Sequence, residues 1–439
     1  MSLTYALDEY FIIKDVRGRM VLDSRGNPTV QVRVVTEGYG VGVANAPSGA
    51  SVGKYEAVEL RDGGKEYLGM GVKRAVENVN KIIAPAIIGM NSARQSEIDR
   101  KMIEIDGTEN KNRLGANAIV ATSVAVLKAA ASTLGVPPYV YLGGKMADTM
   151  PVPMLNTING GLHAGNKLDF QEFMIVPAGF NDFIDALRAS VEVYQVLKTL
   201  LKEKYGPTAV NVGDEGGYAP PMEKTRDALD ILVKAIERAG YEPGGQIALA
   251  LDAASSRLYR EDGERYVLAG EGLELTRDEI VLFYEKLVED YPIVSIEDPL
   301  HENDFEGYAM ITKTLGSKIL IVGDDLFTTN YLRLQKGIEL KAANAVLIKV
   351  NQVGTVTETL DVIKLARENN YRTIISHRSG ETEDTFIADL SVGVCAKLIK
   401  TGAPARGERT AKYNRLIEIY EELEKPRYPG FTVFPKKPT

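Results

Sequence analysis

Residues 247–252 read IALALD, an apolar run that ends in an acid, and similar runs recur through the second half of the chain. The later runs are IVSIED (293–298), ILIVGDD (319–325), AVLIKV (345–350), TIISH (373–377) and AKLIK (396–400). From Asp252 onward, their charged or metal-binding residues follow at steps of 45, 27, 25, 28 and 23 residues. A strand, a loop and a crossover helix take roughly 25–30 residues, so this spacing predicts repeated β/α units.

These units predict an α/β fold with a TIM-like barrel, because the carboxyl ends of barrel strands meet at one face where active sites form. That face would collect Asp252, Glu297, Asp324, Lys349, His377 and Lys400. Such a set indicates a metal site beside a proton-transfer site. The crossover helices are expected near residues 181–204, 223–239, 277–289, 304–315, 330–340, 355–369, 382–392 and 409–422.

The first part of the chain has another pattern. In TVQVRVV (29–35) the valines alternate with polar residues, and glycine-containing turns flank the run, which predicts a three-stranded antiparallel meander. Helices are expected near 71–90, 94–105 and 112–134, the last capped by Asn112. We therefore predict an α+β capping domain at 1–140 and the catalytic barrel at 141–439.

Composition narrows the class of protein. The 439 residues carry a net charge of −8 and contain no long basic run, so direct nucleic-acid binding is not expected. The single cysteine, Cys395, excludes an internal disulfide and suits a reducing cytosol. No signal peptide is evident, and no run approaches the roughly 18 apolar residues of a membrane span. The expected location is the cytoplasm.

Asp252, Glu297 and Asp324 end or follow three successive predicted strands. Hard cations such as Mg²⁺ prefer carboxylate oxygens, so these residues are the candidate metal ligands. A single acid in this position more often caps the following helix. Three in register favour the metal site.

Lys349 and Lys400 interrupt apolar runs, where a lysine is costly unless it is paired. A nearby cation lowers the pKa of a lysine and makes it a general base near neutral pH. Either lysine alone could instead reach solvent. Beside three acids, the functional interpretation is favoured.

Two more acids stand in separate motifs, Glu172 in DFQEF and Glu215 in VGDEGGYAP. Paired acids in different environments can serve as acid and stabiliser, although GDEGG taken alone is equally consistent with a simple turn. In SHRSGET (376–382), Arg378 and Ser379 suit a phosphate group.

The chain closely resembles the enolase family over nearly its whole length. The family's motifs occur in order: DSRGNPT, PSGAS, GGLHAGN, DFQEF, VGDEGGYAP, SIEDP, GDDLF, LIKVNQVG, SHRSGET and IKTGAPARGER. The resemblance implies a Mg²⁺-dependent hydro-lyase that reversibly dehydrates 2-phosphoglycerate to phosphoenolpyruvate in glycolysis and gluconeogenesis. It also implies a barrel that begins ββαα.

The resemblance further implies roles for individual residues. Lys349 would remove the C2 proton, and Glu215, with Glu172 beside it, would protonate the departing hydroxyl. Two Mg²⁺ ions per site are implied, the first on Asp252, Glu297 and Asp324 and the second, bound with substrate, joined by Ser51 from a closing loop. The remaining substrate contacts would come from His163, Gln171, Ser376, His377, Arg378, Ser379 and Lys400.

Other implications concern partners. The family forms homodimers and sometimes octamers, which the sequence does not separate. A superfamily member with another carboxylate substrate is disfavoured by SHRSGET. Some relatives are reported to bind plasminogen at cell surfaces or to join RNA-degrading assemblies. A secondary role of that kind, with a cell-surface or secreted pool, stays open. Lys54 and Tyr55 depart from the histidine that many relatives carry near the end of the closing loop, so its closure is expected to differ in detail.

Overall fold

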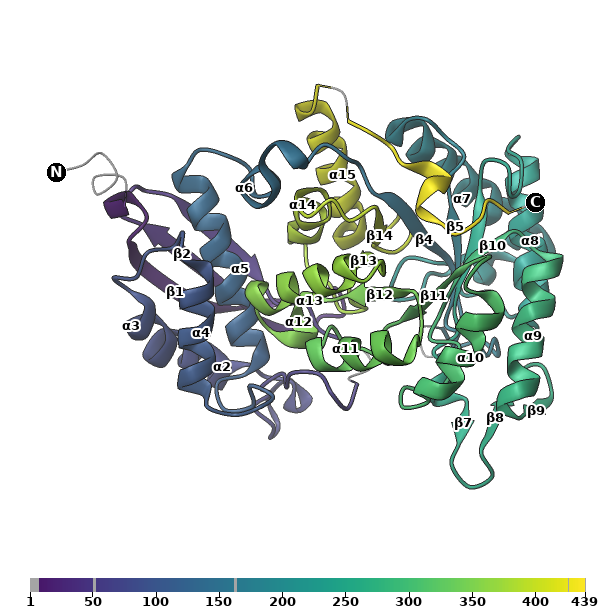
Figure 1. The fold of residues 1–439 in the computed structure, drawn as a ribbon, viewed down its shortest axis with the longest axis horizontal. Helices are drawn as coiled ribbons and strands as arrows, with labels where there is room; N and C mark the ends of the chain where they lie inside the picture. Colours follow the sequence, from purple (N-terminus) through teal and green to yellow (C-terminus); the bar gives the residue numbers. More distant parts are fainter. Residues whose placement is uncertain (1–7, 50–52, 162–163, 425, 439) are drawn as a thin grey trace.

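The computed structural model describes residues 8–49, 53–161, 164–424 and 426–438. Figure 1 shows the purple and blue N-terminal elements at one end of the molecule and the barrel at the other. The N-terminal elements are β1 (Ile13–Leu22), β2 (Pro28–Thr36), β3 (Val41–Asn45), η1 (Glu66–Gly69), α2 (Lys73–Asn78), η2 (Val79–Ile83), α3 (Ala84–Ile87), α4 (Gln95–Asp106), α5 (Ala116–Thr133), α6 (Pro138–Gly143) and η3 (Gly144–Met146).

The N-terminal sheet is an antiparallel meander in the order β1-β2-β3, which confirms the prediction. Val30, Val32 and Val34 all lie on the buried face of β2. Helix α5 packs against β2 and β3, so the alternating valines of this strand meet its small side chains.

Helix α5 differs from expectation at its start. It begins after Gly115 and not at a cap formed by Asn112, because Gly115 turns the chain with a φ of +99° that suits glycine. By length and composition, α5 is also a candidate membrane span among the described residues, although Asn117 and Lys128 interrupt its apolar residues. In this fold 83% of the helix is buried, as in the core of a folded domain.

The second part closes into a barrel with the strand order β10-β11-β12-β13-β14-β4-β5-β6, which confirms the predicted fold class. The strands are β4 (Val152–Asn159), β5 (Glu172–Val176), β6 (Ala248–Asp252), β10 (Ile293–Glu297), β11 (Leu320–Gly323), β12 (Ala345–Ile348), β13 (Arg372–Ser376) and β14 (Leu398–Lys400). The helices are α7 (Phe183–Tyr205), α8 (Thr225–Arg238), α9 (Arg277–Asp290), α10 (Phe305–Leu315), α11 (Tyr331–Leu340), α12 (Val350–Val353), α13 (Val356–Glu368), α14 (Phe386–Gly393) and α15 (Gly407–Glu422).

The first barrel unit runs β4, β5, α7, α8, which is the ββαα start that the resemblance implied. Strand β5 is antiparallel to both β4 and β6. Because β5 is reversed, its first residue, Glu172, lies at the rim where the other strands end, opposite Asp252.

The rim side chains follow from the two-residue repeat of the strands. An apolar plug fills the barrel, and Ala248 and Ala250 of β6 belong to it, so Asp252 is the next inward residue. In the other parallel strands, the residue two positions after the last plug residue also lies at the rim. These residues are Asn156, Asp324, Lys349, Ser376 and Lys400. Strand β10 departs from this count, because a register shift near Ser295 brings Glu297 opposite Asp252.

A small sheet that was not predicted from the sequence accounts for the longest step between strand ends, the 45 residues from Asp252 to Glu297. It consists of β7 (Tyr259–Arg260), β8 (Arg265–Leu268) and β9 (Leu273–Leu275) in antiparallel order. The sheet is inserted between β6 and α9 and projects from the barrel (Figure 1).

A buried acid joins the two parts of the molecule. Asp99 of α4 is fully buried and accepts hydrogen bonds from Ser123 Oγ at 2.7 Å and from the Thr357 hydroxyl and amide at 2.6 and 3.0 Å. Thr357 lies in the first turn of α13, so an N-terminal helix caps a barrel helix.

Replacing Asp99 with alanine is expected to lower the free energy of unfolding by about 3 kcal/mol, because buried donors lose their acceptor. Chemical denaturation followed by circular dichroism measures this. The matched control is Glu97→Ala on the same helix, whose ion pair with Arg94 is exposed and whose effect should stay within about 0.5 kcal/mol. Equal midpoints for both variants would contradict a stabilising role for the Asp99 hydrogen bonds between the two parts.

Candidate active site

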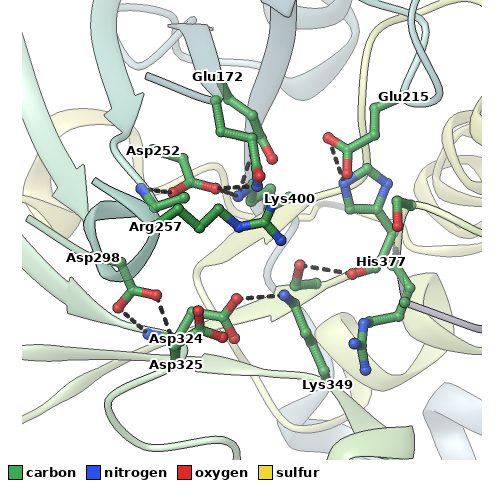
Figure 2. Close-up of a pocket in the computed structure, with 16 residues that line it drawn as sticks. Glu172, Glu215, Asp252, Arg257, Asp298, Asp324, Asp325, Lys349, His377 and Lys400 are labelled. Carbon is green, nitrogen blue, oxygen red and sulfur yellow. Dashed lines mark hydrogen bonds and ion pairs between the residues drawn. The ribbon is translucent and has the colours of Figure 1, made fainter. Parts of the chain in front are cut away.

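The rim of the barrel forms a pocket in which acids and cations face one another (Figure 2). Lys400 lies at its base and is almost fully buried. Its Nζ lies 2.8 Å from Glu297 Oε2, 3.1 Å from Glu172 Oε2 and 3.3 Å from Asp252 Oδ2. Burial alone would lower the pKa of Lys400, but these carboxylates outweigh it and hold that pKa well above its usual value.

The acids around Lys400 also influence one another. Burial raises the pKa of Glu172 well above the usual value for glutamate, with Glu215 adding to the shift and Lys400 opposing it. Burial raises the pKa of Glu297 in the same way, and Asp252 adds to that shift. A positive charge beside these acids therefore strongly stabilises their ionised forms.

Lys349 approaches from the end of β12 and has a different environment. Its Nζ lies 2.5 Å from Asp324 Oδ2, while Gln352 Nε2 donates to Asp324 Oδ1 at 3.0 Å. Burial lowers the pKa of Lys349, but Asp324 outweighs it and the net shift is upward. Conversely, Lys349 overcomes the effect of burial on Asp324 and lowers its pKa.

A second acidic group, Asp298, Asp324 and Asp325, brings carboxylate oxygens within 4.8 Å of one another and could by distance hold a metal ion. The carboxylate of Asp298, however, already accepts from the Tyr308 hydroxyl at 2.9 Å and from the amides of Asp324 and Asp325 at 3.0 and 2.8 Å. We therefore interpret Asp298 as a residue that stabilises the loop of Asp324 and Asp325. The carboxylates of Asp252 and Glu297 lie instead beside the Lys400 ammonium, at 3.3 and 2.8 Å from its Nζ.

Glu215 lies on the other side of the pocket, against His377 (Figure 2). Its Oε2 accepts from Asn156 Nδ2 at 3.0 Å and lies 3.4 Å from His377 Nε2. Burial lowers the pKa of His377 to about 4, with Arg409 acting in the same direction and Glu215 against it. His377 is therefore neutral at physiological pH.

Arg378 follows β13 and is held from the N-terminal part of the chain. Its Nη1 donates to Glu56 Oε2 at 2.9 Å and to Asn351 Oδ1 at 3.0 Å, and its Nη2 donates to Glu56 Oε1 at 3.3 Å. Glu56 also accepts from the amide of Gly53 at 2.9 Å. The orientation of this guanidinium thus depends on both parts of the molecule.

Comparison with known proteins agrees with this geometry. Residues 13–142 match the family model described as "Enolase, N-terminal domain", and residues 147–436 match "Enolase, C-terminal TIM barrel domain". The chain belongs to the enolase family. It is 61% identical to an enolase of Methanopyrus kandleri over 94% of this chain and 96% of the relative. It is 60% identical to an enolase of Methanocaldococcus jannaschii and 58% identical to one of Thermococcus kodakarensis, over 97% and 98% of this chain and 98% of each relative.

The structure brings most of the predicted enolase-family site residues together. The pocket is lined by Gln171, Glu172, Glu215, Asp252, Asp324, Lys349, Ser376, His377, Arg378, Ser379 and Lys400. Glu297 adjoins it through Lys400. Ser51 and His163 lie outside the described residues.

Several residues of this enolase-family site were not predicted. Asn156 could have been predicted from the two-residue repeat of β4, since it lies two positions after the plug residue Met154. Arg257, which also lines the pocket, lies beyond the strand end after Asp252. Glu56 carried no local signal, because its partner is 322 positions away in the sequence.

Proposed function

We propose that this chain catalyses the reversible dehydration of 2-phospho-D-glycerate to phosphoenolpyruvate. The observation that carries the proposal is a lysine, Lys349, and a carboxyl group, Glu215, that reach one pocket from different elements (Figure 2). The reaction removes a proton at C2 and a hydroxyl group at C3, so it needs a base and an acid at different positions. Membership in the enolase family supports the same assignment.

The base should be the lysine that can lose its proton more readily. Lys400 is unsuited, because three carboxylates raise its pKa. Lys349 has an ion pair with Asp324 alone among the described residues. We therefore assign the C2 proton to Lys349, and we assign to Lys400 the stabilisation of charge that develops on the substrate carboxylate.

The acid is assigned to Glu215. Its Oε2 faces the donors of Asn156 and His377, so we place the acidic proton on Oε1. Glu172, whose pKa burial raises, would support this step from beside Lys400. Gln171 is held at the rim by a bond of 3.3 Å to Asp252 and would contact the substrate together with His163 and Ser376.

The rim fits a hard divalent cation, because its donors are carboxylate oxygens and acids outnumber basic residues in the pocket lining. Asp252, Glu297 and Asp324, at the ends of the adjacent strands β6, β10 and β11, would hold a first Mg²⁺. Ser51 would join a second. When bound, Mg²⁺ would neutralise negative charge on the substrate carboxylate and, by competing for Asp324, lower the pKa of Lys349.

The phosphate group of the substrate is assigned to Arg378 and Ser379. A guanidinium offers several N–H donors in a plane, which suits phosphate oxygens. Glu56 and Asn351 fix the plane of Arg378 before any substrate arrives. Less conformational entropy is then lost on binding.

The test is the ultraviolet absorbance of the purified protein with 2-phosphoglycerate, first with Mg²⁺ and then with excess chelator. We expect a rise from the conjugated enol phosphate that requires Mg²⁺ and stops on chelation. Circular dichroism in chelator serves as the control that the fold is retained. A folded protein that gives no rise with Mg²⁺ present would overturn the proposal and direct attention to other carboxylate substrates.

We further propose a cytoplasmic homo-oligomer, as is typical of the family. Apolar side chains on the N-terminal sheet support a contact between subunits, since Met20, Leu22, Val41 and Val43 are 41%, 54%, 40% and 38% exposed. Sedimentation velocity distinguishes a dimer from an octamer, and a monomer at micromolar concentration would contradict this proposal.

A further inference from the structure

Arg409 is a fully buried arginine behind the catalytic pocket, in the first turn of α15. Its Nη1 lies 2.6 Å from His377 Nδ1 and donates to the carbonyl of Arg378 at 2.6 Å. Its Nη2 donates to the carbonyls of Asp214 at 2.9 Å and Ser379 at 2.7 Å. One guanidinium thus ties the loop that carries Glu215 to the loop that carries His377.

The contact with His377 fixes where the imidazole proton lies. A guanidinium has only N–H donors and no acceptor, so Nδ1 must accept and cannot itself be protonated. The proton of the neutral ring is then on Nε2. An imidazolium would place two donors face to face at 2.6 Å, beside a positive charge, so Arg409 also disfavours protonation of His377.

The protonated Nε2 faces the group proposed as the acid, since Nε2 and Glu215 Oε2 are 3.4 Å apart. Asn156 Nδ2 donates to the same oxygen at 3.0 Å. The opposite tautomer would place the lone pair of Nε2 against Oε2 and would favour a proton between them, away from the substrate. The tautomer of His377 therefore decides which oxygen of Glu215 carries the acidic proton.

We propose that Arg409 is a positioning residue that holds His377 as the neutral Nε2–H tautomer and so directs the acidic proton of Glu215 toward the substrate. The inference rests on the proposed function, in which Glu215 acts as the acid. It gives a role to a residue that is not among those lining the pocket.

The first experiment reads the tautomer directly, by long-range ¹H–¹⁵N correlation spectra of the full chain labelled at histidine. The chain has three histidines, so the spectrum is simple, and the His377→Gln variant identifies the signal of His377. We expect Nε2 protonated and Nδ1 unprotonated at neutral pH in the wild type. An Nδ1–H or imidazolium signal for His377 in the wild type would overturn the proposal.

The second experiment uses Arg409→Met, in which we expect the Nε2–H signal to be lost or mixed with the other tautomer. Turnover should fall about tenfold to 100-fold, at or below the lower end of the roughly 10²–10⁴-fold that general acid catalysis contributes, because Glu215 itself is kept. Exchange of the C2 proton should fall much less because Lys349 is unchanged. If exchange and turnover fall equally and the tautomer is retained, Arg409 is merely structural and the proposal fails.

The matched control is Arg406→Met. Arg406 donates to the carbonyls of Gly213 at 3.1 Å and Ser24 at 2.9 Å, in the same region, but does not contact His377. Its variant should keep the wild-type tautomer. If Glu215→Gln kept full turnover, the proposed acid would be wrong, and the tautomer measurement would still test the effect of Arg409 on His377 separately.

Discussion

Replacing Lys349 with alanine is expected to abolish exchange of the C2 proton of 2-phosphoglycerate with solvent and to reduce turnover about 10⁴-fold. The remaining pocket lysine, Lys400, cannot substitute, because three buried carboxylates within 3.3 Å keep it protonated. Proton magnetic resonance of the substrate in deuterated water measures the exchange.

The control for this variant is Lys397→Ala, which removes an exposed lysine just before the same strand as Lys400 and should exchange like the wild type. Circular dichroism would show that Lys349→Ala is folded. Full exchange in that variant would mean that another group is the base.

Replacing Glu215 with glutamine is expected to keep C2 proton exchange and to lower net turnover by about 10²–10⁴-fold. Glutamine keeps the shape of the side chain and an oxygen that can accept from Asn156 and His377, but it cannot deliver a proton to the C3 hydroxyl. Exchange is followed as above, and turnover is followed by the absorbance of phosphoenolpyruvate.

Glu223→Gln makes the same chemical change at an exposed site, where the side chain pairs with Lys167, and should leave both rates near those of the wild type. Equal losses of exchange and turnover in Glu215→Gln would contradict the separation of base and acid. In that case the C2 proton and the C3 hydroxyl would leave in a single step that needs both groups.

The barrel and the N-terminal meander could be predicted because the spacing and alternation of their strands are visible in the sequence. The spacing of Asp252, Glu297 and Asp324 predicted units whose ends meet, and the two-residue repeat explains why most of these side chains point inward. The antiparallel direction of β5 carried no signal of its own, although it places Glu172 at the rim. The division at residue 140 stays a prediction.

The unpredicted part of the site depends on contacts between distant segments. Asp298 supports the Asp324 loop through backbone amides, which have no residue type to recognise in a sequence. Glu56 and Arg409 act on Arg378 and His377 through the packing of separate elements. Such residues are ordinary acids and bases until the fold brings them together.

The ion pair between Glu56 and Arg378, here called the clasp, also constrains the order in which the parts of the site can assemble during synthesis. Pairing of the Ser48 amide with the carbonyl of Gly380 at 2.7 Å, and the reverse bond at 2.8 Å, belongs to the same clasp. During synthesis Glu56 leaves the ribosome 322 residues before its partner Arg378. The barrel units between them can form locally, but the phosphate site proposed at Arg378 and Ser379 is assembled only after both segments have been translated. The proposed active site is therefore complete only after residue 400 has left the ribosome.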